Sequence, residues 1–235
     1  MNKGILYLIP TVIAPGTELK VLPAELTQLC NQINYYLVEN VRTARRCLSA
    51  MKIKQPIESL EFHELSKKTK PEEIAKLMSP LMKGKSVGVM SEAGCPGIAD
   101  PGASAVAYAH QNGIQVVPMV GPSSIFMALM ASGFSGQSFA FNGYLPINKG
   151  ERIQSIKNLE ELAVKTGQTQ IFMETPYRNN HLLEDILKTC SGEMRLCVAR
   201  DISGSNEFIQ TKHVKNWKNK PDLHKQPSIF LLSNS

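Results

Sequence analysis

Residues 86–102 read SVGVMSEAGCPGIADPG and contain the most unusual stretch of the chain. Its start, residues 86–91, is short and mostly apolar, which is typical of a buried strand. The remainder, up to Gly102, is rich in glycine and proline and predicts a loop. Ligands bind outside the carboxyl ends of strands in parallel α/β sheets, so a glycine-rich loop here predicts a binding site. A tight surface loop without a role is the alternative.

Apolar runs and longer amphipathic runs alternate on both sides of this stretch. The expected strands are residues 4–10, 35–39, 86–91 and 114–119. The expected helices are residues 23–32, 41–51, 71–82 and 103–112. This alternation predicts a parallel α/β sheet with right-handed crossovers.

The second half of the chain has a different pattern. Its expected helices are residues 123–132, 150–165 and 179–190, and its expected strands are residues 139–143, 169–174, 194–200, 208–212 and 228–232. Consecutive strands near the carboxyl terminus indicate antiparallel pairing and a mixed sheet. We therefore predict two α/β domains, residues 1–118 with a parallel sheet and residues 119–235 with a mixed sheet.

Composition excludes several classes of protein. The chain has 235 residues, 43% of them hydrophobic, and 26 basic against 20 acidic side chains, a net charge of +6. These values argue against disorder and low-complexity repeats, and they are only weakly in favour of an anionic partner. The five cysteines are widely spaced without C-x-x-C, and no H-E-x-x-H occurs. We therefore expect reduced thiols and no metal site.

The apolar stretch of residues 5–14 resembles a signal peptide only superficially. Pro10 interrupts it, Lys3 is the one basic residue before it, and no A-x-A cleavage site follows. A first buried strand explains it better. No apolar run approaches the length of a membrane span, so we expect a cytoplasmic protein without a membrane partner.

Three further segments hold candidate functional residues. Residues 121–124 (GPSS) open a helix and could bind an anion through free N–H groups, or simply cap the helix. In residues 39–46, Glu39 could accept a proton, and the arginines at 42, 45 and 46 could bind phosphates or form a solvated basic face. Residues 174–178 (ETPYR) could line a cleft or form a structural Glu–Arg pair.

Other signals are weaker or absent. Cys95 has no neighbouring His or Lys to activate it as a nucleophile. The lysine-rich segment of residues 212–225, with Trp217, could contact nucleic acid, although a solvated face is the default. The chain lacks the glycine patterns of dinucleotide-binding and P-loop proteins and the G-x-S-x-G of hydrolases.

These loops, in this order, resemble the tetrapyrrole methylase superfamily, the class III S-adenosylmethionine-dependent methyltransferases. Within it the chain is most similar to the ribosomal small-subunit methyltransferase I family, which methylates a cytidine 2′-hydroxyl in 16S rRNA. The segments that carry the resemblance are LYLIPT (6–11), YYLVENVRTARRCL (35–48), SVGVMSEAGCPGIADPG (86–102), VVPMVGPSSIFMALMASG (116–133), FNGYLP (141–146), FMETPYR (172–178) and VARD (198–201).

The resemblance implies the tetrapyrrole methylase fold, two α/β domains with S-adenosylmethionine in the cleft between them, and a homodimer. The cofactor-binding positions that it implies are Pro10, Thr11, Glu92, Gly94, Cys95, Ser123, Ser124, Ile125, Met173, Ala199 and Pro227.

The departures from the family pattern fall mainly on the acceptor side. Glu39-Asn40-Val41-Arg42 stands where the family has Glu-Asp-Thr-Arg, and residues 11–18 (TVIAPGTE) replace its Pro-Ile-Gly-Asn. Three functions therefore stay open. The first is 2′-O-methylation of ribosomal RNA, with Glu39 as the base and Arg42 on the phosphate. The others are methylation of a corrin- or porphyrin-type tetrapyrrole, and binding of the cofactor or of RNA without catalysis.

Overall fold

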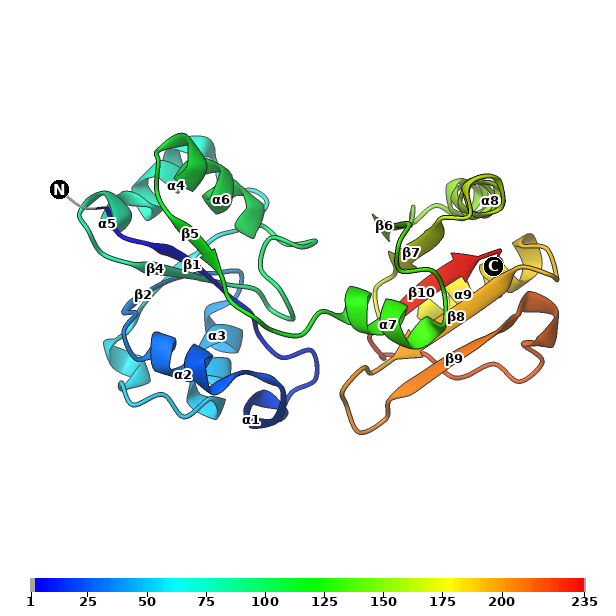
Figure 1. Cartoon of the computed structure of the whole chain (residues 1–235), viewed down its shortest axis with the longest axis horizontal. Helices are drawn as coiled ribbons and strands as arrows, with labels where there is room; N and C mark the ends of the chain where they lie inside the picture. The colour runs from blue at the N-terminus through cyan, green and yellow to red at the C-terminus, as the bar shows by residue number, and fades with distance from the viewer. Residues whose placement is uncertain (1–2, 235) are drawn as a thin grey trace. The chain divides into compact units, whose positions relative to one another are not determined.

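The computed structural model describes residues 3–234. Its contacts divide the chain into two compact units, Met1–Ser123 (unit 1) and Ser124–Ser235 (unit 2). Each unit contains one five-stranded sheet (Figure 1). The domain boundary proposed from the sequence, after Pro118, lies a few residues before this division.

Unit 1 contains the parallel sheet, with the strand order β3-β2-β4-β1-β5. Every pair of neighbouring strands in it is parallel, as the sequence pattern predicts. Its strands are β1 (Leu6–Ile9), β2 (Tyr35–Val38), β3 (Glu61–Glu64), β4 (Val87–Met90) and β5 (Val116–Pro118).

Helices cover both faces of this sheet because successive strand residues point to opposite sides. In β2, Tyr36 and Val38 pack into a core with α2 and α3, whereas Leu37 packs into a second core with α4, α5 and α6. Figure 1 shows α2 and α3 on one side of the strands and α4 and α6 on the other. The helices are α1 (Glu18–Val21), α2 (Ala24–Cys30), α3 (Val41–Ala50), α4 (Pro71–Leu77), α5 (Ser79–Met82) and α6 (Gly102–Gln111), with a 3-10 turn at Ile57–Ser59.

One expectation for unit 1 is wrong, and one strand was not expected. The single helix predicted over residues 71–82 is two short helices, α4 and α5. Pro80 has no N–H to donate to the carbonyl of Lys76, so the hydrogen-bond ladder breaks there. The edge strand β3, with the sequence EFHE, was not predicted from the sequence. Its outer residues Glu61 and Glu64 are exposed, so it lacks the apolar signal of a buried strand.

Unit 2 contains the mixed sheet, with the order β6-β7-β10-β8-β9. Only β6 and β7 pair in parallel, and the other three pairs are antiparallel, which confirms the prediction. Its strands are β6 (Phe139–Tyr144), β7 (Thr169–Met173), β8 (Arg195–Arg200), β9 (Phe208–His213) and β10 (Ser228–Ser233). Its helices are α7 (Ser124–Ser132), α8 (Lys149–Thr166) and α9 (Asn179–Thr189), with a 3-10 turn at Val214–Asn216.

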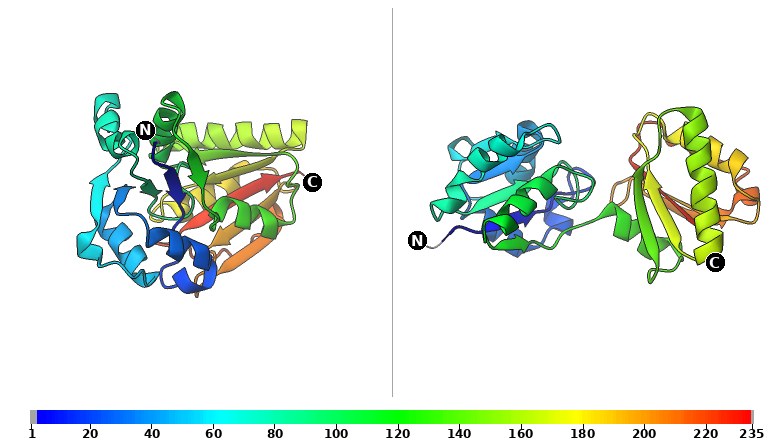
Figure 2. Two further views of the ribbon diagram at one scale, coloured as in Figure 1. Left: turned by 60° about the vertical axis from the view of Figure 1, so that its left-hand side comes forward. Right: turned by 90° about the horizontal axis from the view of Figure 1, so that it is seen from above.

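The helices of unit 2 cover its sheet unequally. Side chains of α8 and α9 pack with Phe172 and Phe230 in one core, and α7 packs with Ile171 and Leu231 in another. Figure 2 shows the long α8 beside the strands. In the part of the chain that the structure describes, no helix combines the length and the apolar character needed to cross a membrane.

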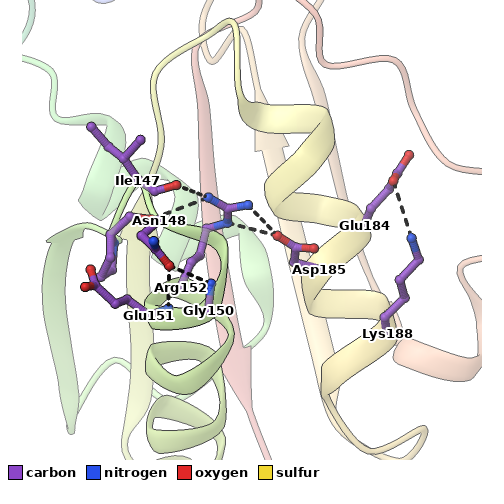
Figure 3. A network of polar contacts seen from close by, with 9 residues as sticks. Ile147, Asn148, Gly150, Glu151, Arg152, Glu184, Asp185 and Lys188 are labelled. Carbon is purple, nitrogen blue, oxygen red and sulfur yellow. Dashed lines mark hydrogen bonds and ion pairs between the residues drawn. The ribbon is translucent and has the colours of Figure 1, made fainter.

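A buried ion pair joins α8 to α9 (Figure 3). Arg152 donates from Nε and Nη2 to Oδ2 of Asp185, at 2.9 and 2.6 Å, and both side chains are more than nine-tenths buried. Arg152 also donates from Nη1 to the carbonyl of Ile147, at 2.8 Å. The guanidinium therefore ties the loop after β6 to both helices.

Removing the acid of this pair should destabilise unit 2. We expect Asp185→Ala to lower the free energy of unfolding by about 3–5 kcal/mol, because it leaves a buried guanidinium without its counter-charge. The adjacent Glu184→Ala is the matched control, since the Glu184 side chain is partly exposed and pairs with the solvent-exposed amines of Lys188, at 3.6 Å, and Lys220, at 3.7 Å. We expect it to change stability by about 0.5 kcal/mol or less. If urea unfolding gives the two variants the same decrease in the free energy of unfolding, this assignment is contradicted.

Candidate functional site

The candidate site lies at the carboxyl edge of the parallel sheet in unit 1. The strands β2, β4, β1 and β5 are successive neighbours and run in the same direction. The loops that follow them therefore leave the sheet at one edge, where parallel α/β sheets bind their ligands. The predicted site residues Glu39, Glu92, Gly94, Pro10 and Thr11 all lie in these loops.

The loop after β4 is held in shape by its own side chains. Oδ1 of Asp100 accepts hydrogen bonds from the N–H groups of Gly97 (2.6 Å) and Gly102 (2.8 Å). The hydroxyl of Ser91 donates to the carbonyl of Gly94, at 2.9 Å. Gly94 has a φ of +75°, a conformation that side chains with a Cβ rarely adopt. Asp100 is a structural residue of the site that the sequence reasoning missed.

Three loops converge around Gly94. The N–H of Thr11 donates to the carbonyl of Gly94, at 2.9 Å, and forms a β-bridge between the loops after β1 and β4. The thiol of Cys95 donates to the carbonyl of Pro122 in the loop after β5, at 3.4 Å. Gly121 lies so close to Pro10 that a Cβ there would overlap the proline ring. The structure thus brings the predicted residues of the first two loops together with the segment before Ser123.

The side chains at this junction have distinct properties. The hydroxyl oxygen of Thr11 is buried and has no hydrogen-bond partner within residues 3–234. An unpartnered buried hydroxyl is costly, and a bound ligand with a polar atom would relieve that cost. Burial raises the pKa of the Cys95 thiol, so the thiol stays protonated and acts as a donor, not as a nucleophile.

Glu39 stands at the end of β2 in an acidic setting. Partial burial raises the pKa of its carboxyl, and the charges of Glu92 and Asp100 raise it further, while Lys67 acts in the opposite direction. The three carboxylates therefore interact at the same edge of the sheet. A raised pKa makes Glu39 a stronger base than an ordinary glutamate.

The three arginines that follow Glu39 lie on α3 and have different surroundings. Arg42 lies exposed in the first turn of α3, which Asn40 caps by accepting a hydrogen bond from the N–H of Thr43, at 3.1 Å. Asn40 thus caps the helix where the resembling family has an aspartate. The guanidinium of Arg45 lies 5.3 Å from the centre of the Phe62 ring. Arg45 and Arg46 line a separate hollow beside the 3-10 turn, and only Arg42 stays a candidate for the acceptor side.

The site positions assigned to unit 2 share one edge of its own sheet. Met173 and Ala199 both lie opposite Ile229, on its two neighbouring strands. The carbonyl of Pro227 accepts from the N–H of Asp201, at 3.0 Å. Ser124 begins α7, and the side chain of Ile125 is buried in the core of unit 2.

The segment at residues 174–178 contains the ion pair that the sequence offered as one of two interpretations. Arg178 donates from Nη2 to Oε1 of Glu174, at 2.6 Å, and the carboxylate is fully buried. Burial by itself raises the pKa of Glu174, but the hydrogen bonds from Arg178 and from the N–H of Thr175 outweigh it and lower that pKa. No group of three or more His, Cys, Asp or Glu within residues 3–234 is arranged to hold a metal ion.

The chain is similar in sequence to known methyltransferases. The family model described as Tetrapyrrole (Corrin/Porphyrin) Methylases matches residues 24–216. A Vibrio cholerae protein named ribosomal RNA small subunit methyltransferase I is 30% identical over 231 residues, which is 97% of this chain and 76% of the relative. A Thermotoga maritima protein of the same name is 34% identical over 182 residues, 77% of each chain.

Two solved structures have a similar fold. The methyltransferase CobJ superposes with a TM-score of 0.64 at 17% identity, over 99% of this chain and 95% of that one. A uroporphyrin-III-C-methyltransferase from Thermus thermophilus superposes with a TM-score of 0.59 at 15% identity, with the same coverage. At these identities the likeness concerns the fold alone.

The raised basicity of Glu39 can be measured directly. In a carboxyl-carbon NMR titration we expect Glu39 to titrate above the usual glutamate range. We expect Glu92→Gln to lower the pKa of Glu39, because Glu92 is the neighbouring negative charge that raises this pKa most. Glu58→Gln, on the 3-10 turn, is the matched control and should leave it unchanged. If Glu92→Gln does not lower the pKa, the two carboxylates do not share a site.

Proposed function

The chain belongs to the tetrapyrrole (corrin/porphyrin) methylase family, and on this premise we propose that it methylates a ribose 2′-hydroxyl of small-subunit ribosomal RNA, using S-adenosylmethionine. It is a methyltransferase by family. The relatives named ribosomal RNA small subunit methyltransferase I support the RNA substrate, since they match most of the chain at about a third identity. The observation that carries the proposal is the convergence of Glu39 with the loops after β1, β4 and β5 at one sheet edge.

The residues at this edge fit the proposed cofactor. S-adenosylmethionine supplies, when bound, a methyl group already activated on a sulfonium sulfur. The loops offer main-chain groups at Gly94 without an obstructing side chain, and the unpartnered hydroxyl of Thr11 offers a polar contact. The residues of unit 1 that we assign to the cofactor are Pro10, Thr11, Glu92, Gly94, Cys95 and Ser123, and the family resemblance adds Ser124, Ile125, Met173, Ala199 and Pro227 of unit 2.

The protein itself has to align the acceptor and take up its proton. The ribose hydroxyl loses its proton as it attacks the methyl carbon, and we assign that proton to Glu39. Its raised pKa suits it to this role at neutral pH. Arg42, exposed one turn along α3, is assigned to the phosphate next to the acceptor ribose.

The tetrapyrrole alternative has less support. The solved tetrapyrrole-type methyltransferases share only 17% and 15% identity with the chain, whereas the ribosomal RNA methyltransferases share 30–34%. A homodimer and a cytoplasmic location belong to the same proposal, because the family resemblance predicts them. A paralogue that binds the cofactor or RNA without catalysis is the third candidate.

The cofactor assignment predicts a selective effect of Gly94→Val. The branched side chain would occupy the approach to the loop backbone, and we expect retention of labelled S-adenosylmethionine to fall at least about tenfold. Gly133→Val is the matched control, because Gly133 has nearly the same φ, +74° against +75°, with open space around it. Equal cofactor binding by the two variants, measured by equilibrium dialysis, would contradict the placement of the cofactor beside Gly94.

The acceptor is tested by incubating the chain with labelled S-adenosylmethionine and isolated small ribosomal subunits, in parallel with a porphyrin precursor. We expect label in the RNA, and we expect Glu39→Gln to slow its appearance by about 10²-fold or more while cofactor binding stays intact. Label only in the tetrapyrrole would overturn the RNA substrate. Cofactor retention without any transfer would favour the non-catalytic paralogue. Full turnover by Glu39→Gln would remove Glu39 from the mechanism.

A further inference from the structure

An exposed aromatic pair stands on the loops of unit 2. The side chain of Tyr177 is 68% exposed, and its ring centre lies 6.2 Å from that of His224, with an edge-to-face angle of 75°. His224 is also exposed. The two rings, named here the Tyr177–His224 platform, come from segments more than forty residues apart in the chain, which the fold brings together. Exposed aromatic side chains offer a flat apolar face on which another ring can stack.

The buried carboxylate of Glu174 stabilises the turn that carries Tyr177. Oε1 of Glu174 accepts hydrogen bonds from the N–H of Thr175 and from Nη2 of Arg178, both at 2.6 Å. The N–H of Arg178 donates to the carbonyl of Thr175, at 2.9 Å. The turn is therefore closed on itself, and Tyr177 projects from a constrained backbone.

The segment that carries His224 is joined to this turn by main-chain contacts. The N–H of Lys225 donates to the carbonyl of Pro176, at 3.0 Å. The amide of Asn179 donates to the carbonyl of Gln226, at 2.6 Å. Lys225 itself has a φ of +59°, which turns the chain sharply after His224. A platform held in this way loses little conformational freedom when a ligand binds.

One cation without an ion pair lies beside the platform. Lys225 follows His224 directly and is exposed, and it makes no ion pair among the described residues. Of the acids nearby, Glu174 is buried against Arg178, whereas Asp222 is exposed and accepts hydrogen bonds from the amide of Asn180, at 2.8 Å, and from the N–H of His224, at 3.0 Å. The hydrogen bond from Asn180 lowers the pKa of Asp222. An anionic ligand with a flat ring matches this combination of a free cation and exposed aromatic faces.

We propose that the Tyr177–His224 platform binds an unpaired nucleotide of the RNA substrate, with its base stacked on Tyr177 and its phosphate paired with Lys225. This inference rests on the proposed function, since it specifies how that RNA is held. Single-stranded RNA is recognised by such stacking on aromatic side chains combined with cations that neutralise the backbone. The platform follows β7 and precedes β10, at the same edge of the sheet as Met173 and Pro227. A nucleotide held there would anchor RNA beside residues assigned to the cofactor.

The test is the affinity of the full chain for a short unstructured RNA of cytidines and uridines, measured by fluorescence anisotropy over a range of salt concentrations. We expect Tyr177→Ala to raise Kd about tenfold and Tyr177→Phe to change it less than about twofold, because phenylalanine keeps the stacking face. Tyr177→Ala should leave the salt dependence unchanged. Lys225→Ala should reduce its slope by about one phosphate contact.

The matched control is Val164→Ala, which removes an exposed apolar side chain from α8. It should leave both Kd and the salt slope unchanged. Unchanged RNA affinity in both Tyr177→Ala and Lys225→Ala, with the thermal midpoint also unchanged, would overturn the inference.

Methylation of small ribosomal subunits separates this inference from the proposed function. We expect Tyr177→Ala to raise KM for the subunits and to leave KM for S-adenosylmethionine unchanged. If the wild type methylates subunits and Tyr177→Ala does so with the same KM, the platform inference fails and the function stands. If the wild type transfers no methyl group to subunits but Tyr177→Ala still loses RNA affinity, the proposed function fails and the platform stands.

Discussion

The parallel pairing of β1 between β4 and β5 is the constraint on which the site depends. Leu6 lies opposite Val87 on one side and Val116 on the other, so three strands reach their carboxyl ends together. In this register Thr11 bridges to Gly94 and Pro10 packs on Gly121. If β1 ran in the opposite direction, its loop would leave from the far edge of the sheet and the convergence would be lost.

Electrostatics at this edge differ from what the net charge of +6 suggests. Glu39, Glu92 and Asp100 interact there and hold the pKa of Glu39 above its ordinary value, which suits a base. The cations assigned to the RNA backbone are few: Arg42 on the first turn of α3, next to this edge, and Lys225 beside the Tyr177–His224 platform of unit 2. The net charge of the chain therefore predicts neither the acidic edge nor the position of these cations.

The sequence predicts most of the fold because its signals are local. Apolar runs next to glycine- and proline-rich loops identify the buried strands, and the second half shows its mixed sheet in the same way. The edge strand β3 was not predicted because its exposed glutamates interrupt the apolar pattern of a buried strand. The break between α4 and α5 depends on a single residue, Pro80, which lacks a backbone N–H donor. Contacts of the site that depend on neighbours in three dimensions could not be predicted from the sequence either. Arg45 turns toward Phe62, and Asp100 acts through the N–H groups of Gly97 and Gly102, which no spacing rule reveals.

The central claim is that the loops at the carboxyl edge of the parallel sheet hold the methyl donor. A crystal structure of the chain with S-adenosylhomocysteine, the demethylated product, tests it most directly. The account predicts the product against the backbone of Gly94 and Cys95, with a polar atom within hydrogen-bond distance of the Thr11 hydroxyl. Product bound elsewhere, for example in the hollow lined by Leu22 and Gln28, with the Thr11 hydroxyl still unpartnered, would contradict it.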